Sequence, residues 1–147
     1  MVGETSEKLV HGSLRDLTPL LSPRSIAVVG ATPDPHRVGG RPLSFLKQFK
    51  FPGPIYPINP KYEEVQGIKC YASVRDIPQQ VDMAVVAVPA AGVLDVLREC
   101  QSAGIPSLTV YTSGFSEIGS EGRKLEKELI TVASEKGTLI CGPNCQG

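Results

Sequence analysis

The chain has 147 residues, enough for one domain with a real hydrophobic core, and its 15 Lys and Arg are balanced by 15 Asp and Glu. A balanced charge provides no overall field that would attract nucleic acid or an anionic membrane, so any binding of phosphate has to be local. The longest apolar runs, residues 83–88 and 26–29, are far shorter than the roughly 20 residues that span a bilayer, which predicts a chain without a membrane span.

The N-terminal 20 residues are expected to be an arm that precedes one domain at residues 21–147. Residues 1–21 contain neither the unbroken apolar segment nor the small-residue cleavage site of a secretory signal. We therefore expect a cytoplasmic protein.

Five short apolar runs are nearly continuous, as is typical of parallel strands that are covered on both faces: residues 25–30, 53–58, 82–88, 107–113 and 138–142. A further run, residues 67–73, is expected to be an irregular extended piece. Helical periodicity lies between the strands: residues 40–49, 91–103 and 121–136.

The last of these helices has Ser120 as its expected N-cap and Gly137 at C′. Strands that alternate with helices indicate right-handed crossovers. The pattern predicts an α/β fold, a doubly wound (Rossmann-like), mostly parallel sheet of about five strands with helices on both faces.

In such a sheet, ligands bind beyond the carboxyl ends of the strands, where the strand order reverses. After the first strand, Gly30 allows a sharp turn, and Gly39 and Gly40 allow a helix N-terminus to come close to a phosphate. Thr32 stands where the GxGxxG fingerprint of dinucleotide-binding proteins has its second glycine, so a different phosphate-containing ligand is indicated. Thr32 and Arg37 are candidates to contact it.

The second strand ends in Asn59-Pro60-Lys61, at the place where NAD-binding chains carry Asp or Glu. Pro60 stiffens the turn and presents Lys61 at a defined angle. An ammonium there suits a phosphate on or near the ribose, as in NADP or in the 3′-phospho-ADP half of coenzyme A (CoA), although a surface lysine without a ligand is the alternative.

The remaining strand ends supply little that could transfer a proton. Residues 87–93 are small and leave room for a flat ring or a thin chain. His11 and His36 fit solvated residues better than catalysts, and Glu117 stands alone. Without a nucleophile paired to a base, a GKS or GKT phosphate loop or a metal-ligand cluster, the predicted site binds rather than reacts, with no catalytic residue and no metal.

The four cysteines, Cys70, Cys100, Cys141 and Cys145, have neither CxxC spacing nor neighbouring histidines. This favours four reduced thiols over a zinc site or a redox dithiol. A functional role for the Cys145 thiol stays open, because this residue lies in a loop rich in Gly and Pro.

Several motifs together resemble the N-terminal CoA-binding domain of NDP-forming acyl-CoA synthetases, the ADP-forming acetyl-CoA synthetase type, relatives of the succinyl-CoA synthetase alpha subunit. They follow in order over about residues 20–147: LSPRSIAVVGAT, VGG, IYPINPKYEEVQGIKCYASVRDIPQQVDMAVVAVPA, SGFSEIGSEG and GPNCQG. The resemblance implies CoA as the ligand, with Lys61 near its phosphorylated nucleotide end.

The positions that the resemblance assigns to CoA binding are Gly30, Ala31, Thr32, Arg37, Val38, Gly39, Asn59, Pro60, Lys61, Val88, Pro89, Ser113, Gly114, Phe115 and Asn144. Asn144 belongs to the GPNC-type loop, which in the family leads toward the acyl-transfer centre. Gln146 departs from the Leu or Pro that is usual there.

The family's reaction, acyl-CoA + NDP + phosphate ⇌ acid + CoA + NTP, runs through a phosphorylated histidine in the next domain and an ATP-grasp domain. Neither His11 nor His36 matches the phosphohistidine motif. The resemblance therefore implies a CoA-binding module of a longer synthetase, with those domains downstream or in a partner chain.

Three alternatives stay open: a CoA-binding head of a protein lysine acetyltransferase, an NADP-dependent Rossmann oxidoreductase with Arg37 and Lys61 on the 2′-phosphate, and a stand-alone CoA-binding regulatory protein.

Overall fold

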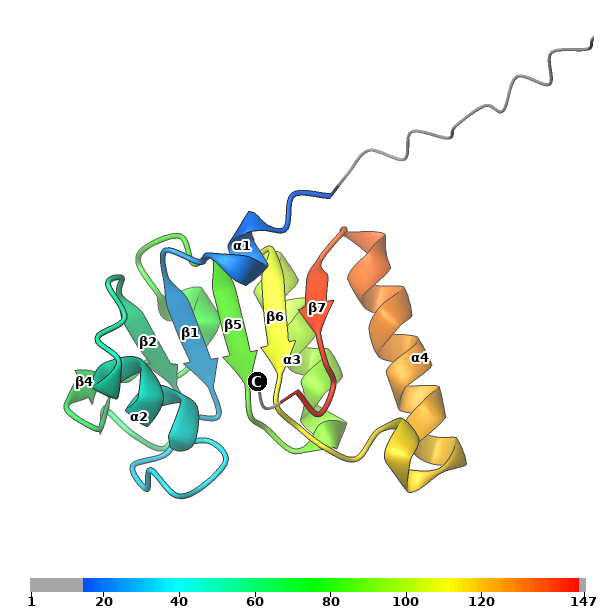
Figure 1. Ribbon diagram of the computed structural model, residues 1–147, viewed down its shortest axis with the longest axis horizontal. Coiled ribbons are helices and arrows are strands. Elements are labelled where there is room, and N and C mark those ends of the chain that lie inside the picture. The colour runs from blue at the N-terminus through cyan, green and yellow to red at the C-terminus, as the bar shows by residue number, and fades with distance from the viewer. Residues whose placement is uncertain (1–14, 146–147) are drawn as a thin grey trace, which may run out of the picture.

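Five short strands form one parallel sheet in the order β2-β1-β5-β6-β7 (Figure 1). They are β1 (Ile26–Val29), β2 (Ile55–Ile58), β5 (Met83–Val86), β6 (Ser107–Val110) and β7 (Leu139–Cys141). The computed structural model describes residues 15–145. Each strand lies inside one of the five apolar runs of the sequence. Two inner strands, β1 and β5, are buried along their whole length between two layers of helices.

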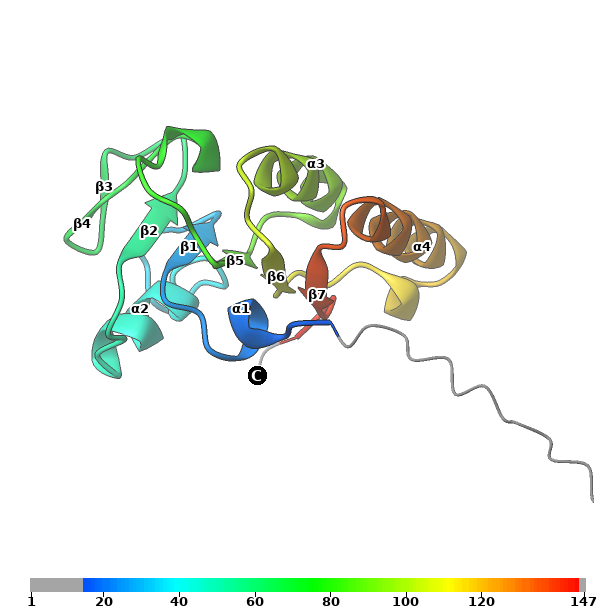
Figure 2. The same cartoon turned by 90° about the horizontal axis from the view of Figure 1, so that it is seen from above.

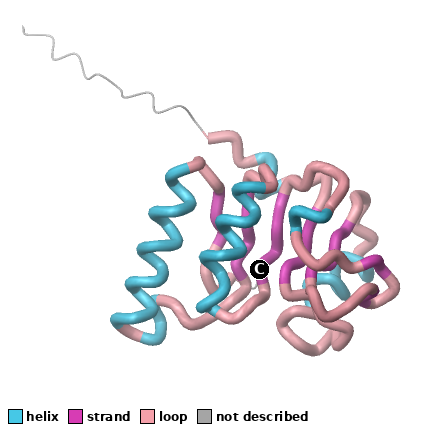
Figure 3. The backbone as a smooth tube through the Cα atoms, turned by 180° about the vertical axis from the view of Figure 1, so that it is seen from behind, coloured by secondary structure: helices cyan, strands magenta, loops and turns pink. Residues whose placement is uncertain are grey.

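Helices cover both faces of the sheet, as predicted for a doubly wound fold. Seen from above, α1 (Thr18–Leu21) and α2 (Arg41–Gln48) lie on one face, while α3 (Ala90–Ser102) and α4 (Ser120–Glu135) lie on the other (Figure 2). The view from behind shows α3 and α4 side by side across the strands (Figure 3). The crossovers from β5 to β6 and from β6 to β7 therefore run over one face, and the crossover from β1 to β2 runs over the opposite face.

The core has two layers that follow the alternation of side chains along the strands. In β1, Ala27 and Val29 belong to the same buried cluster as Leu97 of α3 and Leu129 of α4. The alternate residues, Ile26 and Val28, pack with Leu43 of α2.

The predicted irregular piece at residues 67–73 is confirmed. It contains β4 (Ile68–Lys69), which pairs antiparallel with β3 (Glu64–Val65), and Tyr71 makes a single parallel bridge to Ile58. The short hairpin therefore lies beside the end of β2.

One helix boundary was predicted wrongly. Gly119, with a φ of +109°, is the N-cap of α4, and Ser120 is its first helical residue, without a side-chain cap hydrogen bond. A glycine is required because the chain turns through positive φ between the short helix η2 (Ser116–Ile118) and α4. At the other end, Gly137 follows the C-cap with a φ of +66°, as predicted.

Residues 1–14 of the predicted arm lie outside the described part of the chain. The described residues that follow are attached to the domain: α1 packs on β6, and the Ser107 hydroxyl donates a hydrogen bond of 3.0 Å to the carbonyl of Pro19. A domain boundary after residue 20 stays a prediction. Between residues 15 and 145, the helices are all too short or too polar to cross a bilayer.

Candidate functional site

The strand order reverses between β1 and β5, so the loops after these two strands diverge at that point. They begin in contact. Gly30 has a φ of +85°, and a Cβ added there would lie 2.7 Å from the carbonyl oxygen of Ala87. The positive φ agrees with the sharp turn expected at Gly30, and the close approach to Ala87 is a second reason for glycine there.

A cleft of about 430 Å³ opens at this point, at the carboxyl ends of β5 and β6. Small side chains line it. Ala87, Val88 and Ala90 form an apolar wall after β5, and the polar residues Thr112 and Ser113 follow β6. The hydroxyl of Thr112 donates a hydrogen bond of 2.6 Å to the carbonyl of Val88, which ties the two sides together. The full lining is Val38, Ala87, Val88, Pro89, Ala90, Tyr111, Thr112 and Ser113.

Four predicted ligand residues, Val38, Val88, Pro89 and Ser113, line this cleft. The sequence did not single out Tyr111 or Thr112, and Ala90 was considered only as part of the run at residues 87–93. Their position in loops rich in small residues was the only available signal.

The loop between β1 and α2 holds an unpaired polar group. The hydroxyl oxygen of Thr32 is buried and has no hydrogen-bond partner. The backbone N–H groups of Val38 and Gly39 also have no acceptor among residues 15–145. Buried polar groups usually find a partner, so the Thr32 hydroxyl is a candidate to bind an oxygen of a ligand, and the two N–H groups offer further donors in the same loop.

Gly39 and Gly40 are also needed for a reason that the sequence did not suggest. A Cβ at Gly39 would lie 2.1 Å from the carbonyl oxygen of Gly30, and one at Gly40 would lie 1.9 Å from that of Asp34. Both glycines let the loop pack on itself. Arg37 lies 3.7 Å from Asp34, with both side chains largely in solvent, so this ion pair leaves the guanidinium free to move.

At the end of β2, Asn59 holds the turn together. Its Nδ2 donates to the carbonyl of Ala31 at 2.9 Å, and its Oδ1 accepts from the backbone N–H of Lys61 at 3.0 Å. Both ends of the amide are therefore engaged, and a direct contact between Asn59 and a ligand stays a prediction. Lys61 is exposed, and its ammonium contacts no acceptor within the described chain.

Sequence reasoning missed Gln66. Its Nε2 donates to the carbonyls of Thr32 at 3.2 Å and Gly40 at 3.0 Å, so the turn of the β3–β4 hairpin fastens the first loop. Lys47 donates in turn to the carbonyl of Gln66. No local pattern could reveal this, because Gln66 and Thr32 are far apart in the sequence.

The loop after β6 differs most from the expectation. Phe115, predicted to contact the ligand, has a side chain that is 0% exposed in the core, so its side chain cannot reach a ligand. The N–H of Gly114 donates to the carboxylate of Glu117, and this hydrogen bond lowers the pKa of Glu117. Glu117 therefore stays ionised and supports the loop.

The last predicted loop folds back on β6. The N–H of Asn144 donates to the carbonyl of Thr112 at 2.9 Å, and the side chain of Asn144 is exposed. This loop is next to the cleft but does not line it.

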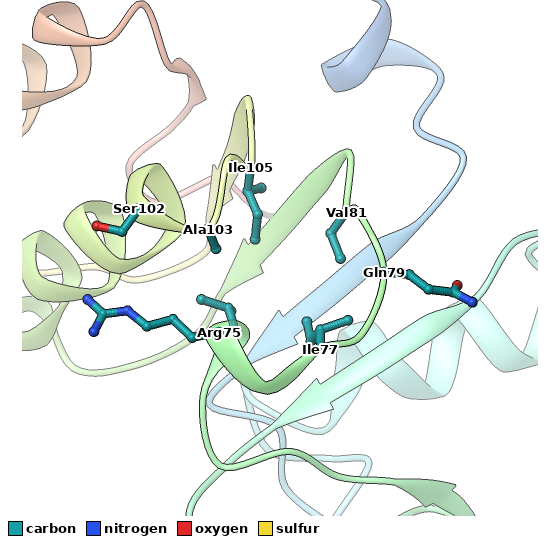
Figure 4. Close-up of a pocket in the computed structure, with 8 residues that line it drawn as sticks. Arg75, Ile77, Gln79, Val81, Ser102, Ala103 and Ile105 are labelled. Carbon is teal, nitrogen blue, oxygen red and sulfur yellow. The ribbon is translucent and has the colours of Figure 1, made fainter.

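A second groove, of about 190 Å³, lies near the amino ends of β5 and β6 (Figure 4). Figure 4 shows Arg75, Ile77 and Val81 facing Ser102, Ala103 and Ile105 across it. None of the predicted ligand residues takes part, and parallel sheets of this class bind their ligands at the other end. The titratable and thiol side chains among residues 15–145 make no group of three that could hold a metal ion.

The family described as "CoA binding domain" matches residues 24–147. The chain is 44% identical, over 126 residues, to acetate–CoA ligase [ADP-forming] II subunit alpha from Pyrococcus furiosus, covering 86% of this chain and 27% of that protein.

Two solved structures are also similar. One is a dinucleotide-forming acetyl-coenzyme A synthetase 1 from Candidatus Korarchaeum cryptofilum, in complex with phosphate and ADP, with a TM-score of 0.85, 45% identity, and coverage of 90% of this chain and 28% of that one. The other is a conserved hypothetical protein from Pyrococcus furiosus, with a TM-score of 0.63, 32% identity, and coverage of 83% and 95%. The chain thus spans less than a third of the length of the synthetase relatives.

Proposed function

This chain belongs to the family of CoA-binding domains, and we propose that it holds CoA in the cleft at the carboxyl ends of β5 and β6. The observation that carries the proposal is the buried hydroxyl of Thr32, which has no partner, in a loop where the N–H groups of Val38 and Gly39 are also unpaired. Three unpaired donors in the loop that leads into α2 fit phosphate oxygens.

The other parts of CoA fit the surroundings of this loop. The pantetheine chain is thin and mainly apolar, as the wall formed by Ala87, Val88 and Ala90 requires. The 3′-phosphate is anionic, and the free ammonium of Lys61 lies in the turn that Asn59 fastens to the loop. These residues would bind and orient CoA, and CoA would supply the thiol that carries an acyl group.

An NADP-binding site would share the cationic turn, so it is the alternative that a titration has to separate. Isothermal titration of the chain with CoA, NADPH and NAD makes the distinction. We expect heat with CoA, and a loss of about 1 kcal/mol, roughly fivefold in Kd, in Thr32→Val, because this change removes one hydrogen bond to phosphate.

Thr131→Val is the matched control, since Thr131 is exposed on α4, where its hydroxyl bonds only to the carbonyl of Lys127. Its affinity for CoA should equal that of the unchanged chain. Binding of NADPH without binding of CoA would refute the proposal.

At the level of the whole protein, we propose a CoA-binding module of an NDP-forming acyl-CoA synthetase, which makes an acid, CoA and NTP from acyl-CoA, NDP and phosphate. Support comes from the two relatives named as acetyl-CoA-forming enzymes, which match at 44% and 45% identity. Phosphohistidine and ATP-grasp domains, in the same or a partner chain, would supply the steps for which this chain has no residues.

A stand-alone CoA-binding protein is the second candidate, because the chain covers 95% of the hypothetical protein from Pyrococcus furiosus. The native reading frame separates the two candidates. A frame that continues into a phosphohistidine segment supports the synthetase, and one that stops near residue 147 supports the stand-alone protein.

A further inference from the structure

Two thiols meet at the end of β7, next to the cleft but outside its lining. The Sγ atoms of Cys141 and Cys145 are 3.4 Å apart. Their spacing in the sequence did not indicate a redox dithiol. The structure nevertheless brings the two sulfurs to within about 1.4 Å of the length of a disulfide bond, roughly 2.05 Å.

Backbone hydrogen bonds fold the segment that carries the two cysteines. The N–H of Cys145 donates to the carbonyl of Val110 at 3.1 Å, next to the bond from Asn144 to Thr112, so the loop is folded back onto β6. Gly142 makes the fold possible with a φ of +107°, since a Cβ there would lie 2.7 Å from the carbonyl oxygen of Val110. These hydrogen bonds hold the backbone segment that carries the two thiols.

The other two cysteines, Cys70 and Cys100, are buried and therefore poorly reactive. Cys100 is 0% exposed, and burial raises its pKa to about 12. Cys70 is buried, and burial raises its pKa as well. Cys141 and Cys145 are only partly buried, so a small reagent can reach them, and reactive thiols need such access.

We propose that Cys141 and Cys145 form a thiol–disulfide exchange site that reduces low-molecular-weight disulfides. The Cys145 thiolate attacks one sulfur of a disulfide RS–SR, forms a mixed disulfide and releases RS⁻, which takes up the proton that Cys145 lost. The Cys141 sulfur then attacks Sγ of Cys145, releases the second RS⁻, and passes its proton to it. Two protein thiols and RS–SR thus become one protein disulfide and two RSH.

The order of attack follows from the surroundings of Cys141. Cys141 lies in β7, where it pairs with Thr109, whereas Cys145 lies in the loop that follows, so we assign the first attack to Cys145. The hydrogen bond with Cys145 and partial burial raise the pKa of Cys141, which agrees with a second, resolving role for it. The inference does not depend on the binding of CoA.

The test uses the reduced full chain with oxidised glutathione as the disulfide, followed by alkylation of the remaining thiols and mass spectrometry. We expect two of the four thiols to be lost, with two molecules of glutathione released and none retained, and with the lost thiols cross-linked to each other in the C-terminal peptide. Loss of no thiols, or a chain that keeps glutathione on Cys145, overturns the proposal.

Variants assign the roles. Cys141→Ser should stop at the mixed disulfide, with one glutathione retained on Cys145, and Cys70→Ser should behave like the unchanged chain. A Cys141→Ser variant that releases both glutathione molecules contradicts the assignment. The result for the unchanged chain decides the proposal even if a variant folds poorly.

Discussion

At the end of β2, Asn59 and Lys61 have different roles. Asn59 uses both ends of its amide to fasten the turn to the loop after β1, while Lys61 keeps a free ammonium. The residue types of this turn could be interpreted from the sequence, because an Asn-Pro pair favours a turn. The division of roles could not, since it depends on where the carbonyl of Ala31 lies.

Lys61→Ala should weaken the binding of CoA because it removes a charged hydrogen bond to the 3′-phosphate. We expect a loss of about 1.5 kcal/mol, the low end for such a bond, because Lys61 is exposed to solvent. Dephospho-CoA should bind equally well to the unchanged chain and to the variant. Titration calorimetry with the two ligands measures the difference, and Lys127→Ala, an exposed lysine on α4, is the matched control. Equal losses for both ligands would place Lys61 away from the 3′-phosphate.

Among the elements, the strands were the most predictable part. Runs such as Ile26–Val29 are buried on both faces, so their composition alone indicates a central strand. The ends of helices and the loops were less predictable. Gly119 replaces Ser120 as the N-cap, and Phe115 faces the core, because both depend on how the chain turns between β6 and α4.

The contact between α4 and the loop after β6 depends on Gly122. A Cβ there would lie 1.6 Å from the carbonyl oxygen of Phe115. Although Gly→Ala in a helix usually stabilises by about 1 kcal/mol, we expect Gly122→Ala to destabilise by about 1 to 3 kcal/mol through overpacking.

Gly92→Ala in α3 is the control, since its Cβ would meet Val88 at an ordinary 3.5 Å. In urea unfolding, the free energy of unfolding of this variant should equal or exceed that of the unchanged chain. If both variants gained stability, the close packing of α4 on this loop would be refuted.

The start of β1 is tied to β5 by a charged pair. The carboxylate of Asp82 accepts from the backbone N–H of Arg24 at 2.9 Å and from its Nε at 3.0 Å, and these bonds lower the pKa of Asp82 below 3.8. A lowered pKa means that the stabilisation is present above pH 3.8 and is lost as the pH falls through the folded-state value.

Asp82→Asn should therefore lower the free energy of unfolding by about 1 kcal/mol at neutral pH, and the difference should shrink below about pH 3.8. Asp95→Asn is the control, because Asp95 is exposed and pairs with Arg98 at 3.6 Å on the helix surface. Urea unfolding at neutral and acidic pH measures both variants. A difference that grows in acid would contradict this role for Asp82.

For the whole molecule, the alternation of strands and helices was enough to predict the doubly wound sheet. The rule that ligands bind beyond the carboxyl ends of parallel strands pointed to the loops that line the cleft. What the sequence could not supply were contacts between distant segments. The hydrogen bonds from Gln66 to the first loop and the meeting of Cys141 with Cys145 both depend on the folded backbone.

Binding of CoA at this cleft is tested by titrating the isotope-labelled chain with CoA and following its amide resonances. We expect shifts at Thr32, Val38, Val88 and Ser113, around the cleft at the carboxyl ends of the strands. Shifts confined to the groove between Arg75 and Ser102, or the absence of any shift at saturating CoA, would contradict it.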